Sequence, residues 1–236
     1  MPDGGLVDGK GDRGRSRSLT HAPTRWVLLA AAVGLADAGI LSGWLHLGRG
    51  WFVPVHAIIV GGFTAAYLAA TGIRPAVQLR RRWRAGLVGG LVFGAVLAYG
   101  VSGQPASARP EGAHLAAALI WLGVVYGTVD ALLITVVPAL AVYGSRPAEE
   151  LRAVGARARW GGMALLASLV VAAAYHLGFQ EFRGGALLQP LVGNAIVTAA
   201  YLLTGNPLAP VLAHVVMHGA AVLHGAGTTY QLPPHY

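Results

Sequence analysis

Three histidines set in apolar sequence are the residues most suited to chemistry. His214 and His218 are four residues apart, and His176 ends an earlier apolar run. If Pro207 to Leu223 forms a helix, this spacing places the two imidazoles on one face, about one turn apart. Such a pair can hold a metal ion or a proton, and a third imidazole can join it inside a bundle. The alternative is that these histidines bond groups of neighbouring helices and only support packing.

An aspartate in the fourth apolar run is the carboxylate that could join the histidines. Asp130 lies between Gly127 and Pro138. Placing an acid at mid-membrane costs about 2.5–3.5 kcal/mol, so Asp130 needs a partner or a role. We expect it to face the inside of the bundle, with a structural hydrogen bond as the alternative. The predicted site comprises Asp130, His176, His214 and His218.

This set of groups predicts the activation of a water molecule inside the membrane. A divalent metal such as Zn²⁺, held by His176, His214 and His218, would bring the pKa of its bound water towards neutrality. Without a metal, Asp130 and a histidine can share the role of general base. Either route supplies a nucleophile where bulk water is absent, as hydrolysis within lipid requires.

The composition is that of a membrane protein. Of 236 residues, 55% are hydrophobic and only 11% are charged, which is unusual for a soluble domain. The chain has no cysteine, so disulfides, thiolate ligands and a cysteine nucleophile are excluded. The net charge of +8 does not indicate nucleic-acid binding. The arginines fall between the apolar runs, where they contact lipid headgroups and set orientation.

Seven apolar runs predict an all-α fold, a polytopic transmembrane bundle of about seven helices. Each run is near the length that crosses about 30 Å of hydrocarbon. The runs are Trp26–Leu47, Phe52–Thr71, Ala85–Val101, Leu115–Tyr143, Trp160–Leu177, Ala186–Thr204 and Pro207–Leu223. The expected transmembrane domain covers residues 23–225. We expect residues 1–22 to form a basic, disordered cytoplasmic tail and residues 226–236 to form a short polar tail.

The linkers between the runs predict the orientation of the chain. The second linker holds five arginines and the fourth holds four, whereas the first, third and fifth hold one each. The positive-inside rule therefore puts the N-terminus in the cytoplasm and the C-terminus outside. A preference for arginine over lysine, with abundant alanine and glycine, fits a GC-rich bacterial genome. We expect a multi-pass protein of the bacterial inner membrane.

Other polar and small residues in the runs have structural interpretations. We expect Asp37 to form a structural hydrogen bond near Ser42, and His56 to lie at the membrane interface. Gln189 and Asn194 are expected to link neighbouring helices. Glycines in the third run have near-GxxxG spacing and predict close helix packing. These glycines are Gly86, Gly89, Gly90 and Gly94.

The segment from Ala172 to Ala221 resembles the CPBP family, the CAAX proteases and bacteriocin-processing membrane proteins. In that family one helix carries EExxxR, a later helix ends in FxxxH, and a last helix carries HxxxN. His176, which ends AAAYH, is similar to the histidine of the second motif. His214, which ends TGNPLAPVLAH, is similar to that of the third, and His218 stands where the family usually has Asn. The resemblance implies a CPBP-like core over about residues 115–225.

The first family motif, EExxxR, does not occur in this sequence. In GTVDALLITVVP, Asp130 takes the place of the second glutamate, Val129 of the first, and Ile134 of the arginine. The rival counterpart is the true pair Glu149 and Glu150 in RPAEELRAVG. That pair lies in a basic linker after a proline, where acids favour the start of a helix. We therefore favour Asp130.

The resemblance implies an intramembrane endopeptidase that cleaves a membrane-anchored peptide or protein with an activated water, with or without a metal. Two other functions stay open. The missing glutamate and arginine are compatible with a catalytically inactive relative that acts as an immunity or partner-binding module. A transporter or proton-relay protein could use the same polar groups, but such folds often have two related halves. We find no internal repeat, and the oligomeric state stays open.

Overall fold

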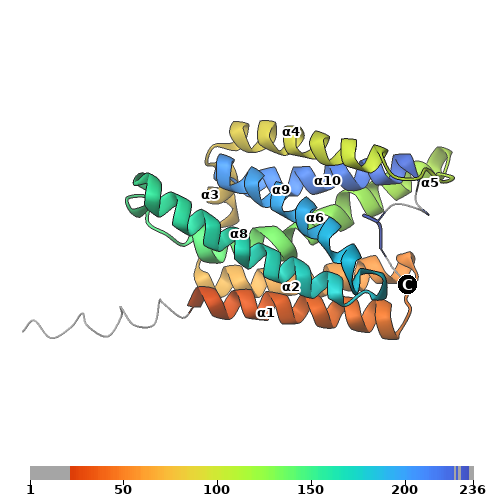
Figure 1. The fold of residues 1–236 in the computed structure, drawn as a ribbon, viewed down its shortest axis with the longest axis horizontal. Coiled ribbons are helices and arrows are strands. Elements are labelled where there is room, and N and C mark those ends of the chain that lie inside the picture. The colour runs from red at the N-terminus through yellow and green to blue at the C-terminus, as the bar shows by residue number, and fades with distance from the viewer. Residues whose placement is uncertain (1–21, 226, 228–229, 234–236) are drawn as a thin grey trace, which may run out of the picture.

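The computed structural model of the protein describes residues 22–225, 227 and 230–233. These residues form helices joined by short turns and include no strand, so the all-α prediction is confirmed. Figure 1 shows the long helices running side by side. The regular helices of the bundle are α1 (Ala22–Ala38), α2 (Arg49–Thr71), α3 (Pro75–Arg80), α4 (Trp83–Ser102), α8 (Val154–Leu177), α9 (Leu188–Thr204) and α10 (Leu208–His224).

Six helical segments are long and apolar enough to cross a membrane, which makes this a multi-pass membrane protein. They are Pro23–Trp44, Arg49–Thr71, Trp83–Ser102, Gly112–Gly144, Val154–Leu177 and Gly185–Thr204. The first continues α1 through the π-helical η1 (Gly39–Trp44). The seventh expected pass is α10, which is apolar but has only 17 residues. The expected tail of residues 1–22 lies almost entirely outside the described residues.

The segment Gly112–Gly144 forms the centre of the bundle. It is one continuous helical path of 33 residues that contacts α1, α8, α9 and α10. Its parts are α5 (Gly112–Ala118), η2 (Leu119–Tyr126), α6 (Gly127–Ala131), η3 (Leu132–Val136), α7 (Val137–Ala139) and η4 (Leu140–Gly144). The η2, η3 and η4 parts are π-helical, a geometry that often marks functional sites. Asp130 lies in α6, directly between two of them.

Glycines on α4 let this helix approach α10 closely. A Cβ atom added to Gly90 would lie 2.6 Å from Leu212 Cβ and 2.9 Å from the Ala209 carbonyl oxygen. A Cβ on Gly94 would lie 2.7 Å from Val216 Cβ. Real Cβ atoms do not approach that closely, so only glycine permits this spacing. The expected role of the third-run glycines in close helix packing is confirmed.

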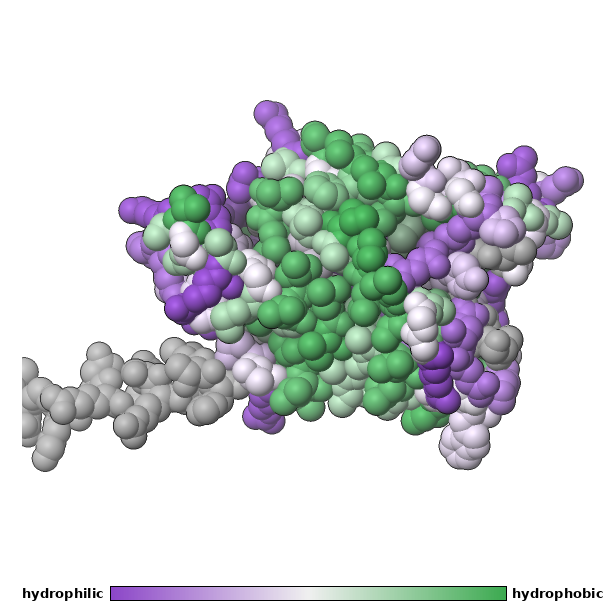
Figure 2. Space-filling view, viewed as in Figure 1, coloured by the Kyte–Doolittle hydropathy of each residue, from purple (hydrophilic) through white to green (hydrophobic). Residues whose placement is uncertain are grey.

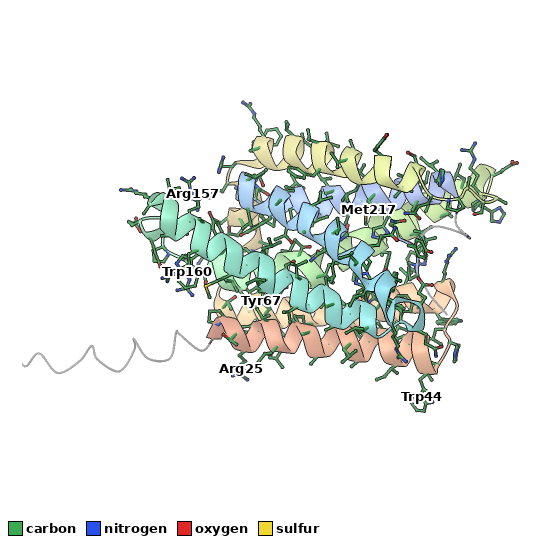
Figure 3. All side chains as sticks on the ribbon, in the orientation of Figure 1. Arg25, Trp44, Tyr67, Arg157, Trp160 and Met217 are labelled. Carbon is green, nitrogen blue, oxygen red and sulfur yellow. The ribbon has the colours of Figure 1, made fainter. Side chains whose placement is uncertain are left out.

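The surface agrees with a bundle that crosses a bilayer. Figure 2 shows a broad hydrophobic band between two hydrophilic ends. Exposed apolar side chains on the long helices include Ile58 and Leu166, which are 74% and 64% exposed. Arg157 and Trp160 lie at one end of the molecule, and Trp44 lies at the other (Figure 3).

The described part of the C-terminal tail folds back onto the bundle. Leu232 is buried, Gln104 Nε2 donates a hydrogen bond of 3.2 Å to Gln231 Oε1, and the Arg49 guanidinium donates to the Pro233 carbonyl. The tail was expected to be short and polar. Its described residues instead contact the bundle, and hydrophobic periodicity in the sequence does not predict these contacts.

Candidate functional site

One carboxylate faces two imidazoles in the middle of the bundle. Asp130 Oδ2 lies 3.5 Å from His214 Nε2 and 3.5 Å from His218 Nε2. All three side chains are almost fully buried, at 6% exposure or less. Both separations exceed an ordinary N–H···O distance of about 2.9 Å, so neither imidazole forms a short hydrogen bond to this carboxylate oxygen.

Small residues on the central segment allow this approach to α10. A Cβ atom added to Gly127 would lie 3.1 Å from His218 Cδ2 and 3.2 Å from the His214 carbonyl oxygen. One turn earlier, a Cβ on Gly123 would lie 3.3 Å from Gly219 Cα. The backbones of the central segment and α10 are therefore close enough for the short Asp130 side chain to reach both histidines.

The start of α10 is fixed by the turn that precedes it. The Leu208 backbone N–H donates a hydrogen bond of 2.8 Å to Asn206 Oδ1, as a helix-capping side chain does. Pro207 and Pro210 occupy the first turn, where a missing N–H has no cost. The expected start of this helix is confirmed, and it sets His214 and His218 at fixed positions along α10.

Backbone contacts orient two of the three imidazoles. His214 Nδ1 lies 3.1 Å from the Pro210 carbonyl oxygen, and His176 Nδ1 lies 2.7 Å from the Ala172 carbonyl oxygen. A carbonyl only accepts, so each Nδ1 carries the proton and donates it. In the neutral form, each Nε2 then carries a lone pair, as a general base or a metal ligand requires.

All four predicted residues line one cavity of about 220 Å³, which the central segment, α8 and α10 help to enclose. His176 reaches it from the last turn of α8. Met217 of α10, labelled in Figure 3, also lines it. A water molecule occupies about 30 Å³ in the liquid, so the cavity has room for several. Further polar side chains in the wall are Gln104, Tyr126, Gln189, Asn194, Tyr230 and Gln231.

Three polar atoms at the site have no hydrogen-bond partner among the described residues. They are Asp130 Oδ1, His218 Nδ1 and His218 Nε2. Buried polar atoms are nearly always satisfied by protein or by ordered water. Because both residues line a cavity with room for water, water molecules would complete their hydrogen bonds.

A network of uncharged side chains supports the wall of the cavity. Asn194 Oδ1 accepts a hydrogen bond of 2.7 Å from Thr135, and Asn194 Nδ2 donates one of 2.9 Å to Ser168 Oγ. Ser168 Oγ in turn donates to the Ile134 carbonyl at 2.6 Å. The expected role of Asn194 as a link between helices is confirmed, and Asn194 also lines the cavity.

A second buried acid and histidine lie outside the cavity. The Asp37 carboxylate on α1 pairs directly with His56 Nδ1 on α2. The expectation that His56 lies at the interface is wrong, since the structure buries it completely. Asp37 has a structural bond as expected, but its partner is a histidine 19 residues away. The sequence feature that could have predicted this pair is an acid in one apolar run and a histidine in the next.

Aromatic rings separate this pair from the cavity. The Tyr126 ring centroid lies 4.9 Å from that of His218 and 5.6 Å from that of His56. The Tyr126 hydroxyl bonds the Tyr175 hydroxyl at 2.9 Å. The sequence did not single out either tyrosine, because aromatic residues in apolar runs are common and only the fold shows what they touch.

The rival acidic pair lies outside the cavity that the histidines line. Glu149 and Glu150 are exposed in the linker before α8, and neither lines the cavity. Glu150 Oε1 accepts a hydrogen bond of 2.6 Å from the Trp160 indole. Among the residues that the structure describes, Asp130 is the acid that faces the histidines.

Comparisons with known proteins add nothing to this geometry. A scan against protein-family models found no match, and searches of curated proteins and of solved structures found none either. The resemblance to the CPBP family stays a prediction from the sequence motifs.

The predicted metal site has suitable donors but is not assembled as a three-ligand site. Imidazole nitrogen and carboxylate oxygen are both common ligands of Zn²⁺. Within the described ranges, no three His, Asp or Glu side chains are grouped closely enough to hold a metal ion. Zinc binding by His176, His214 and His218 therefore stays a prediction.

Proposed function

We propose that this protein is a CPBP-type intramembrane endopeptidase of the bacterial plasma membrane, with its N-terminus in the cytoplasm. It would hydrolyse a peptide bond of a membrane-anchored substrate. The observation that supports this most is Asp130 Oδ2 at 3.5 Å from both His214 Nε2 and His218 Nε2. Ionisable groups buried in a membrane bundle are costly, and a role in function is the usual reason for them.

His214 is the best-placed general base of this set. Its Nδ1–H is bonded to the Pro210 carbonyl, so its Nε2 lone pair faces Asp130 and the cavity. A water molecule there would transfer a proton to Nε2 as its oxygen attacks the substrate carbonyl carbon. Asp130 would stabilise the imidazolium that forms, as a carboxylate does in other acid–base sites.

The second half of the reaction returns the proton. The tetrahedral intermediate carries an oxyanion, to which a neutral His218 can donate its single N–H. As the C–N bond breaks, the His214 imidazolium would protonate the leaving amine, giving a free carboxylic acid and a free amine. His214 is then neutral again, as it was at the start.

An inactive relative is the second candidate, and one observation favours it. Asp130 is the sole acid among the described residues that line the cavity, whereas the CPBP motif has a glutamate pair. A protein of this kind would keep its fold and its cellular role when the acid is replaced.

The proposal is tested by comparing the N-termini of membrane proteins in cells that contain wild-type, Asp130→Asn or His214→Gln protein. Mass spectrometry of the membrane fraction identifies termini created by cleavage. We expect a set of wild-type termini to disappear in both variants, because each change removes a group that activates water.

His46→Gln is the matched control, since His46 is exposed and outside the cavity. It should keep the wild-type termini at equal protein abundance. The proposal fails if Asp130→Asn and His214→Gln also keep them, or if deleting the protein changes no terminus.

A further inference from the structure

A second cavity lies apart from the candidate active site. It has a volume of about 320 Å³ and shares no lining residue with the first cavity. Its wall comes from α2, α3, the central segment and the start of α10, and is almost wholly apolar. We call it the lipid slot. Its main apolar contacts are Leu68, Leu79, Leu132, Val136, Val137 and Val211.

Two buried hydroxyl groups in the wall of the lipid slot have no hydrogen-bond partner in the described part of the chain. They are Tyr67 Oη and Thr64 Oγ1, in side chains that are 1% and 8% exposed. Figure 3 labels Tyr67 on α2. Neither hydroxyl oxygen is exposed at the surface of the slot, so the wall that an occupant meets is apolar.

Arginines border the lipid slot on its α3 side. Pro75, Gln78 and Leu79 of α3 line the slot, and Arg74 directly precedes this helix. Arg80 occupies its last turn, and both arginines are exposed. A short, exposed helix with Val77 59% and Leu79 43% exposed is suited to the boundary between acyl chains and headgroups.

The position of α3 is fixed by a buried side chain. Asn206 Nδ2 donates hydrogen bonds to the carbonyls of Gln78 and Leu79, at 3.3 and 2.9 Å, and also to that of Arg81. Asn206 is completely buried. These hydrogen bonds fix α3 on the bundle. The arginines beside the slot therefore start from fixed backbone positions, which favours binding of a phosphate.

We propose that the lipid slot binds one anionic phospholipid. An acyl chain lies in the apolar cavity, and the phosphate lies against Arg74 and Arg80. The charge complementarity favours an anionic lipid over a zwitterionic one, since arginines beside the membrane attract anionic headgroups. This site needs no hydrolytic activity, so its test is independent of the proposed function.

The test is native mass spectrometry of the full chain, purified from bilayers that hold equal amounts of phosphatidylglycerol and phosphatidylcholine with identical acyl chains. We expect one retained lipid per protein, with phosphatidylglycerol favoured about fivefold, which corresponds to about 1 kcal/mol. Equal retention of the two lipids, or retention of a different hydrophobic molecule, contradicts the proposal.

Variants separate the charge from the cavity. Arg74→Gln with Arg80→Gln should abolish the preference, whereas Arg109→Gln, an exposed arginine outside the slot, should leave it unchanged. Leu132 is half-buried in the wall of the slot, so Leu132→Phe should fill part of the slot and prevent lipid binding. Leu166→Phe is its control, because Leu166 is 64% exposed and outside the slot.

If Leu132→Phe fails to fold, the arginine variants still test the proposal. If the double variant Arg74→Gln with Arg80→Gln prefers phosphatidylglycerol as strongly as Arg109→Gln does, the phosphate does not lie against Arg74 and Arg80. Full lipid retention by folded Leu132→Phe overturns the assignment of the acyl chain.

Discussion

Buried histidines in this protein differ in what their ring nitrogens meet. His56 bonds the Asp37 carboxylate directly, and the pair lies outside both described cavities. His214 and His218 instead stand 3.5 Å from Asp130 beside a cavity with room for water. The first arrangement suits a structural link between α1 and α2, and the second suits chemistry.

The structural role of the first pair predicts a specific stability pattern. Asp37→Leu or His56→Phe alone leaves one polar group buried without its partner and should cost about 3–5 kcal/mol of unfolding free energy. The double variant should recover most of this loss, because no unpaired group remains. Unfolding in detergent by denaturant measures all three proteins, and strictly additive losses would contradict the pairing.

The sequence identified Asp130, His176, His214 and His218 because ionisable groups are rare and expensive in apolar runs. It could not pair Asp37 with His56, since two residues 19 positions apart meet only if α1 and α2 lie side by side at the right rotation. For the same reason, the sequence did not place Tyr126, Tyr230 and Gln231 in the cavity wall.

Packing between elements controls the geometry of the site. The near-GxxxG pattern on α4 predicted close contact from the sequence, because it depends on residue size alone. The π-helical turns on both sides of α6 were not predictable. These turns pack against α1, α8, α9 and α10, contacts between segments that lie apart in the sequence.

Gly127 is the position at which the approach of α6 to the two histidines of α10 can be tested. Gly127→Val places a Cβ atom 3.1 Å from His218 Cδ2 and adds two methyl groups, so α6 and α10 must separate. We expect a loss of about 1–3 kcal/mol of stability and a loss of cleavage, because Asp130 moves away from both imidazoles. Thermal unfolding in detergent, with the cleavage assay, measures both effects.

Gly61→Val is the matched control for this change. A Cβ atom on Gly61 meets nothing within 4 Å, and valine favours a helix more than glycine does. It should keep both stability and cleavage. If Gly127→Val behaves like Gly61→Val, close contact between α6 and α10 does not position the acid.

At the scale of the whole molecule, composition and run length were sufficient to predict a multi-pass helical bundle. Each apolar run must satisfy its backbone within itself, so lipid permits little other than helices. The docking of residues 230–233 against the bundle was not predictable, because single contacts such as Arg49 with the Pro233 carbonyl leave no periodic signal.

The arginine distribution predicts the orientation of the whole molecule. With seven passes, the two chain ends lie on opposite sides of the membrane. A reporter that fluoresces only in the cytoplasm should be active at the N-terminus, and alkaline phosphatase, which is active only outside, should be active at the C-terminus. Activity of both reporters on one side would contradict seven passes.

The central claim is that three histidines and Asp130 surround one wet cavity while His56 stays dry. Water-edited solid-state NMR of ¹⁵N-histidine-labelled protein in bilayers measures this directly, with signals assigned through single His→Gln variants. The account predicts rapid polarisation transfer from water to the rings of His176, His214 and His218, and slow transfer to His56. Transfer to His214 and His218 as slow as that to His56 would contradict it.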